Sequence, residues 1–61
     1  MTFEINDKIK DIEDSDCYYE GIVTGYNEYL VTKIVWCGEQ INESPLNEII
    51  TFKWWKQEKI N

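Results

Sequence analysis

Five aromatic residues are the strongest candidates for binding chemistry in this chain. They are Tyr18, Tyr19, Trp36, Trp54 and Trp55. Adjacent residues on a strand point to opposite faces, so one ring of each Tyr or Trp pair can face the core while its neighbour faces solvent. Because aromatic ring faces attract cations, an outward ring near carboxylates is typical of a cation-binding surface. The alternative interpretation is that the outward ring packs beneath a loop or the C-terminal tail and closes the core.

Acidic residues are concentrated in the N-terminal half of the chain. Residues 1–28 contain eight acidic residues and two lysines, whereas residues 29–61 contain four of each. The densest group consists of Asp11, Glu13, Asp14, Asp16 and Glu20. The negative electrostatic field of these residues would attract a basic partner and speed its association. The alternative is that they form a solvated loop that only promotes solubility. Ca²⁺ also takes oxygen ligands, but the spacing lacks a calcium-binding loop and its distal Glu, so we predict no metal site.

Lysines alternate with aromatic residues near the C-terminus. The segment contains Lys53, Trp54, Trp55, Lys56 and Lys59. Phosphate neutralisation combined with base stacking would make it a nucleic-acid-binding segment. With three lysines, no Arg and a negative field around them, we expect nucleic acid to be a less favoured partner than a protein. The sequence contains no basic amphipathic helix, which is the feature that would indicate binding to a membrane surface.

Residues typical of a catalytic centre are scarce. The chain has no His, so Cys17 and Cys37 lack the usual partner for nucleophilic catalysis. Two thiols without His also make a poor zinc site. A chain of 61 residues leaves little room for a substrate cleft around paired carboxylates. We therefore predict no enzymatic activity and no cofactor.

The elements that must position these side chains are short strands. β-Branched and aromatic residues gather in brief runs between Gly, Asn, Asp and Pro. We predict strands at about Lys8 to Ile12, Tyr18 to Thr24, Tyr29 to Trp36, and Ile49 to Trp54 or Trp55. These strands are separated by an acidic loop from Asp11 to Asp16, a turn at Gly25 to Glu28 and an irregular loop from Ile41 to Asn47. We expect the tail from Lys56 to add a short fifth strand or a 3₁₀ turn. Four or five strands at this spacing favour an all-β antiparallel barrel, and no sustained helical stripe supports a helical bundle.

Length and charge limit the class of protein. A 61-residue chain forms one small domain and buries only about 60% of its unfolded surface. The net charge is −6, with twelve acidic residues and six lysines. The N-terminus has neither a basic region nor a long apolar run typical of a secretion signal, so we expect a cytoplasmic protein with two free thiols. Abundant Ile, Lys and Asn without Ala or Arg indicate an AT-rich genome, such as that of a virus or low-GC bacterium.

Two stretches resemble small Tudor-like, SH3-like barrels. Residues 6–11 followed by 18–24 resemble the opening of these domains, and residues 29–36 followed by 37–39 resemble their third strand and its turn. The resemblance covers about residues 5–55 and implies a barrel that binds peptides, proteins or nucleic acid. In the Tudor group an aromatic cage accepts methylated Lys or Arg, which would place Tyr18 or Tyr19 and Trp36 in the cage. The sequence differs from the family pattern where Cys37 separates Trp36 from Gly38.

We therefore predict a protein-interaction module that binds a basic peptide or protein surface. Its expected binding residues are Tyr18, Tyr19, Trp36, Trp54, Trp55, Asp14, Asp16 and Glu20. Acidic groups would attract the partner and exposed aromatic rings would anchor it, so Trp36→Ala should abolish binding without unfolding. The alternatives are a nucleic-acid-binding barrel, an acidic inhibitor that mimics nucleic acid, and a homodimer formed through the outward rings.

Overall fold

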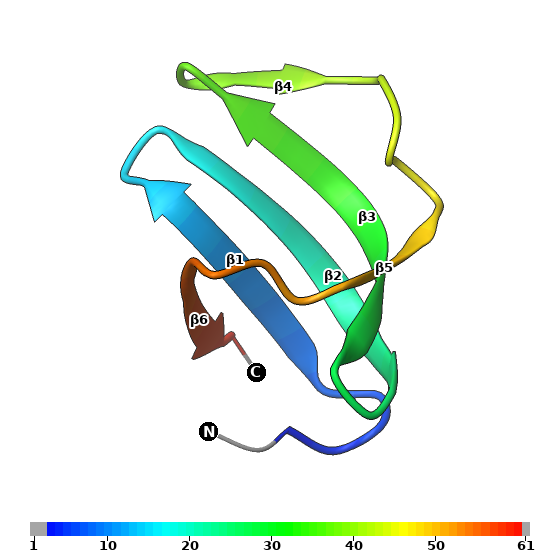
Figure 1. Cartoon of the computed structure of the whole chain (residues 1–61). Helices are drawn as coiled ribbons and strands as arrows, with labels where there is room; N and C mark the ends of the chain where they lie inside the picture. The colour runs from blue at the N-terminus through cyan, green and yellow to red at the C-terminus, as the bar shows by residue number, and fades with distance from the viewer. Residues whose placement is uncertain (1–2, 61) are drawn as a thin grey trace.

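Six strands make up the regular structure of residues 3–60, the part of the chain that this computed structural model describes (Figure 1). They are β1 (Lys8–Asp14), β2 (Cys17–Gly25), β3 (Glu28–Trp36), β4 (Glu39–Ile41), β5 (Ile49–Thr51) and β6 (Lys56–Lys59). The described residues contain no helix, and in particular none long and apolar enough to span a membrane. The predicted all-β class is thereby confirmed, with six strands in place of four or five.

The strands form one antiparallel sheet in the order β4-β3-β2-β1-β6, and β5 pairs with β3 away from this path. The β2–β3 register shifts after Glu20, where Glu20 lies opposite Lys33 but Gly21 lies opposite Val31. Such a bulge bends the bulged strand and increases its twist. Among the described residues no pairing joins β4 to β6, so the strand pairings do not close a complete barrel.

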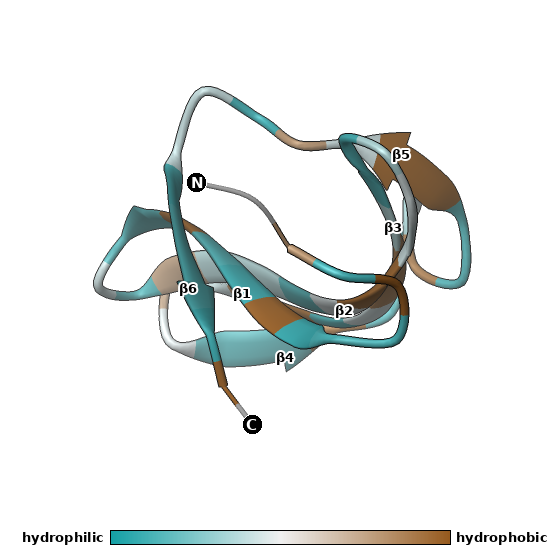
Figure 2. Ribbon diagram, turned by 90° about the horizontal axis from the view of Figure 1, so that it is seen from below, coloured by the Kyte–Doolittle hydropathy of each residue, from teal (hydrophilic) through white to brown (hydrophobic). Residues whose placement is uncertain are grey.

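The central strands alternate between an inner and an outer face. On β1 the inward Ile9 and Asp11 are buried, whereas the outward Lys8 and Lys10 retain exposure. Ile9 contributes to a core with four residues of the next two strands, namely Val23, Tyr29, Val31 and Ile34. Figure 2 shows β1, β2 and β3 curving around this interior, with β5 beside β3. Phe3, Leu46, Ile50 and Phe52 are among the partly buried residues that pack against the core.

Gly21 is required because the Tyr29 ring crosses it. A Cβ atom at Gly21 would lie 2.4 Å from the Tyr29 ring and 2.3 Å from the carbonyl oxygen of Leu30. On its other side, the same ring stacks on Phe52 with centroids 5.0 Å apart. The glycine therefore makes room for the largest side chain in the core.

Two predicted loops and one predicted strand are wrong at their ends. β1 continues to Asp14, so the acidic loop shortens to a turn at Ser15 and Asp16. Residues 39–41, expected to close β3 and begin a loop, form the short strand β4.

The predicted strand from Ile49 ends at Thr51, and Trp54 and Trp55 lie in a bend. The physical reason is that β5 pairs with β3 whereas β6 pairs with β1, so residues 52–55 must cross between two different strands. Figure 1 shows this connection passing across the sheet.

Candidate functional site

Three of the five predicted aromatic residues come together at one end of the sheet. The ring centroids of Tyr19 and Trp55 lie 5.3 Å apart, and Trp36 lies 6.1 Å from each of them. All three side chains are half-buried, so each keeps part of its ring accessible to solvent. We call this cluster the aromatic trio.

Each member of the trio comes from a different element. Tyr19 occupies the inner face of β2, opposite Ile34 on β3. Trp36 is the last residue of β3, and Trp55 lies in the bend before β6. Residues 17 positions or more apart in sequence therefore form one surface. The sequence predicted a patch of this kind but not which member of each aromatic pair belongs to it.

A buried carboxylate holds the Trp55 segment in place. Asp11 is completely buried on the inner face of β1. Its Oδ2 accepts a hydrogen bond from the Lys53 amide at 3.0 Å, and its Oδ1 accepts one from Gln57 Nε2 at 3.0 Å. Gln57 Nε2 also donates to the carbonyl oxygens of Lys53 and Trp55. These bonds fix both sides of the bend, so Asp11 is a structural residue rather than part of an exposed acidic loop as predicted.

The other member of each aromatic pair lies elsewhere. Trp54 is fully exposed, with a relative accessibility of 104%. Tyr18 lies on the outer face of β2, where the Lys10 ammonium lies 4.4 Å from its ring centroid. The tyrosine pair thus points to opposite faces, as the strand argument predicts. The tryptophan pair also differs in exposure, although it lies in a bend and not in a strand.

Asp11 lies opposite Tyr19 in the β1–β2 pairing, and two carboxylates affect the Tyr19 hydroxyl through their charge. Burial raises the pKa of Tyr19 above its ordinary value, and the charges of Glu13 and Asp11 raise it further. Glu13 is exposed near the end of β1, and sequence reasoning placed it in the acidic group without selecting it as a binding residue. The β1–β2 register shifts between Ile12 and Asp14, so Glu13 is an extra residue whose face simple alternation from Asp11 does not determine.

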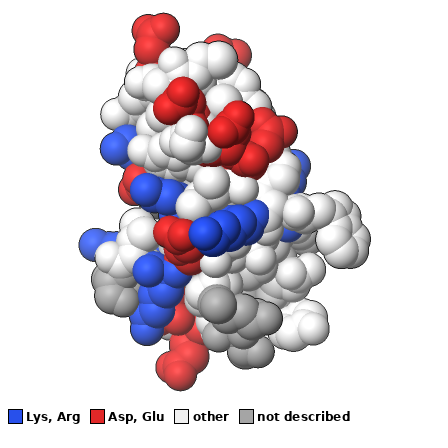
Figure 3. Space-filling model, turned by 90° about the vertical axis from the view of Figure 1, so that its left-hand side faces the viewer, with Lys and Arg blue, Asp and Glu red and all other residues white. Residues whose placement is uncertain are grey.

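The predicted acidic residues divide between two places. Asp14 and Asp16 lie exposed at the turn between β1 and β2. This turn meets the turn between β3 and β4, because the Gly38 amide donates to the Asp16 carbonyl at 3.0 Å. Figure 3 shows acidic side chains gathered at this end of the molecule and lysines farther along the same view. Glu20 lies on the outer face, 3.9 Å from the Lys33 ammonium, and is separated from the trio by the sheet.

The predicted lysine segment does not present three unpaired cations. Lys56 forms an ion pair with Glu58 at 3.3 Å, and Lys59 forms one with Asp7 at 3.5 Å. The phosphate-neutralising charge of this segment is therefore largely compensated.

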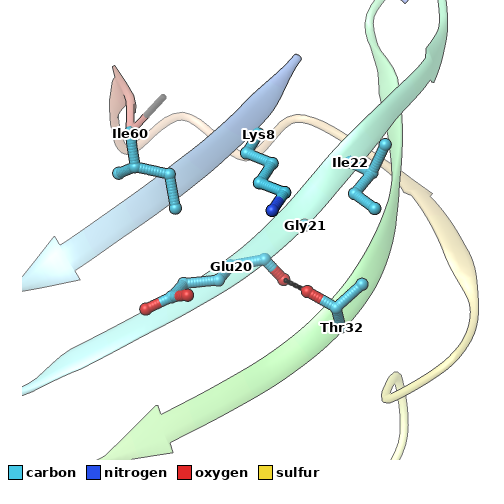
Figure 4. Close-up of a pocket in the computed structure, with 6 residues that line it drawn as sticks. All are labelled: Lys8, Glu20, Gly21, Ile22, Thr32 and Ile60. Carbon is cyan, nitrogen blue, oxygen red and sulfur yellow. Dashed lines mark hydrogen bonds between the residues drawn. The ribbon is translucent and has the colours of Figure 1, made fainter. Parts of the chain in front are cut away.

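A hollow of ≈ 290 Å³ lies on the outer face of the sheet (Figure 4). It is lined by Lys8, Glu20, Gly21, Ile22, Thr32 and Ile60. Lys33 neutralises Glu20 at its edge, and Thr32 donates its hydroxyl to the Glu20 carbonyl oxygen at 3.3 Å. None of the three rings of the trio lines the hollow.

The two cysteines meet beside the acidic end. The Cys37 amide donates to Cys17 Sγ at 3.4 Å, and both thiols are free. The electrostatic effect of the adjacent Cys17 is the main cause that raises the pKa of Cys37 above its ordinary value. Residues 3–60 contain no group of three or more Cys, Asp or Glu side chains arranged to hold a metal ion.

No known protein family, curated protein or solved structure matches the chain.

Proposed function

We propose that this chain is a small SH3-like, Tudor-like barrel that acts as a non-catalytic protein-interaction module for basic segments. The antiparallel order of β3, β2 and β1, with β6 returning to pair with β1, supports this architecture. The function is argued from the site alone, because a fold of this kind does not specify an activity.

The aromatic trio is the observation that carries the proposal. With centroids 5.3–6.1 Å apart, a cation above the plane of the three ring centres would remain within about 6 Å of all of them. The exposed carboxylate of Glu13 would balance part of its charge. The expected anchor is thus the ammonium group of one lysine of the partner.

Charge at the same end of the molecule favours a basic partner over other classes. Asp14 and Asp16 lie exposed on the turn beside the Cys37–Gly38 turn that directly follows Trp36. Their field would steer a lysine-rich segment toward the trio and repel phosphate. Trp54 adds a fully exposed ring next to Trp55 in the chain, available to pack against the aliphatic part of the partner.

The test uses a fluorescein-labelled peptide of eight lysines, titrated with the protein and followed by fluorescence anisotropy. Trp36→Ala and Trp55→Ala should each weaken binding by about tenfold or more, since buried aromatic anchors dominate such interfaces. Tyr26→Ala is the control, because it removes an exposed aromatic ring from the turn between β2 and β3, outside the trio. A trimethyllysine version of the peptide tests whether the trio prefers a less hydrated cation.

Circular dichroism of each variant separates loss of binding from loss of fold. Equal affinities for the wild type and two folded trio variants would overturn the proposal. Tight, salt-dependent binding of single-stranded DNA by the unmodified protein would instead favour the nucleic-acid alternative and the segment around Lys53. Sedimentation that shows a dimer disrupted by Trp54→Ala would favour the homodimer.

A further inference from the structure

Cys17 and Cys37 are placed for direct reaction with one another. Cys17 begins β2, and Cys37 follows the end of β3, so the two strands carry the thiols to the same end of the hairpin. The Cys37 amide donates a hydrogen bond to Cys17 Sγ at 3.4 Å, so the two residues are in direct contact. The β2–β3 register pairs Tyr18 with Val35, which places Cys17 level with Trp36 and next to Cys37 at the end of the ladder.

Cys37 lies in a turn with a defined backbone conformation. Cys37 and Gly38 have φ values of 54° and 80°, which is the two-residue type I′ turn between β3 and β4. Asn, Asp or Gly is the usual choice at the first of these positions, and a thiol offers the turn no comparable local hydrogen bond. The backbone bond from Gly38 to Asp16 holds this turn against the residue that precedes Cys17.

We propose that Cys17 and Cys37 form a reversible intramolecular disulfide, which makes this end of the hairpin a redox modification site. One thiol releases its proton, and the thiolate attacks hydrogen peroxide and takes one oxygen as a sulfenic acid; the hydroxide that leaves combines with that proton to form one water. The second thiol then displaces that hydroxyl group, giving the disulfide and a second water. Two thiols lose two electrons and two protons, and one peroxide is reduced to two waters. A dithiol such as dithiothreitol reverses the step by thiol–disulfide exchange.

The disulfide also affects the aromatic trio, and this part rests on the proposed function. Trp36 immediately precedes Cys37, and Tyr19 follows Cys17 by two residues. The new bond ties the two backbones that carry these rings and limits their separation. A binding surface ordered in advance loses less entropy when the partner binds, so the oxidised form is expected to bind the eight-lysine peptide roughly two- to tenfold more tightly.

The chemical test treats the reduced full-length protein, at about 1 µM, with hydrogen peroxide and follows intact mass and free thiols. We expect the loss of two hydrogen atoms and of both alkylatable thiols in the monomer. Two groups held together have an effective concentration in the millimolar range or above, which favours the intramolecular bond over an intermolecular one by about a thousandfold. Cys17→Ser and Cys37→Ser should each abolish the monomer disulfide. Disulfide-linked dimers from the wild type, or sulfinic acids in place of a disulfide, would overturn the proposal.

Two further measurements keep the chemistry and the function separate. The indole N–H resonance of Trp36 should shift on oxidation and return with dithiothreitol, whether or not the trio binds a peptide. Equal peptide affinities of the oxidised and reduced forms would overturn the effect on binding. If the disulfide forms and neither form binds the peptide, the proposed function fails while the modification site stands.

Discussion

The Tyr29 hydroxyl donates a hydrogen bond of 3.0 Å to Oδ2 of Asp11, and both residues are completely buried. The bond joins β3 to β1 across the interior. The same carboxylate also accepts hydrogen bonds from the Lys53 amide and the Gln57 side chain, which belong to the segment that carries Trp55. A single buried acid thus connects the core to the candidate site.

Removing the Tyr29 hydroxyl should destabilise the fold without removing the ring. Tyr29→Phe keeps the stacking on Phe52 but deprives a buried carboxylate of one of its donors. Hydrogen bonds to charged groups contribute about 1.5–3 kcal/mol, so the free energy of unfolding should fall by that amount in urea titrations. A loss below about 0.5 kcal/mol would show that the remaining donors and water satisfy Asp11.

Stability should decrease at alkaline pH. Burial raises the pKa of Tyr29 above its ordinary value of 10.0, and the charge of Asp11 and the hydrogen bond to it raise it further. A pKa higher in the folded than in the unfolded state gives a contribution that is fully present below about pH 10 and is lost as the pH rises above it. Urea midpoints measured from pH 8 to 11 should therefore fall at the upper end. Tyr29→Phe should flatten this fall, and the raised pKa of Tyr19 should account for part of the remainder.

Gly21→Ala should be strongly destabilising. The added methyl group would meet the Leu30 carbonyl at 2.3 Å and the Tyr29 ring at 2.4 Å. Overpacking of this kind costs about 1–3 kcal/mol, which is a large share of the stability of so short a chain. Gly38→Asn is the informative comparison, because no atom lies within 4 Å of its added Cβ and Asn tolerates the positive φ of 80°. Similar thermal midpoints for both variants would contradict the close approach at Gly21.

Affinity for the eight-lysine peptide should fall with ionic strength. The Debye length shortens from about 30 Å at 0.01 M to about 10 Å at 0.1 M, which screens attraction to exposed acids such as Asp14 and Asp16. The double variant Asp14→Asn, Asp16→Asn should bind more weakly at low salt and show a shallower salt dependence. An unchanged salt slope in that variant would place the steering charge elsewhere on the molecule.

The proposed disulfide should raise thermal stability. Closing the loop between Cys17 and Cys37 should raise the free energy of unfolding by about 3 kcal/mol, because it reduces the conformational entropy of the unfolded chain. For a domain of this size that corresponds to a Tm higher by about 10 °C or more. Scans of the oxidised and reduced protein, with Cys37→Ser as the control that cannot close the loop, measure the difference. A lower Tm after oxidation would show that the bond distorts the type I′ turn.

The strand content of this chain follows from local sequence alone. Runs such as residues 29–35 are rich in β-branched and aromatic residues, and Gly25 and Gly38 mark turns. Alternation also places Tyr18 and Tyr19 on opposite faces of β2, because side chains on any strand alternate in direction.

Only the tertiary structure decided which aromatic residues meet and which acid is buried. Tyr19, Trp36 and Trp55 converge because β6 pairs with β1 and the preceding bend crosses the sheet, and these are long-range choices that no local pattern encodes. Asp11 has a side chain of a type usually found at the protein surface. Its burial is possible because three hydrogen-bond donors from distant segments satisfy its oxygens. Sequence determines the strands through backbone and side-chain preferences, whereas the pairing of strands far apart in the chain determines the site.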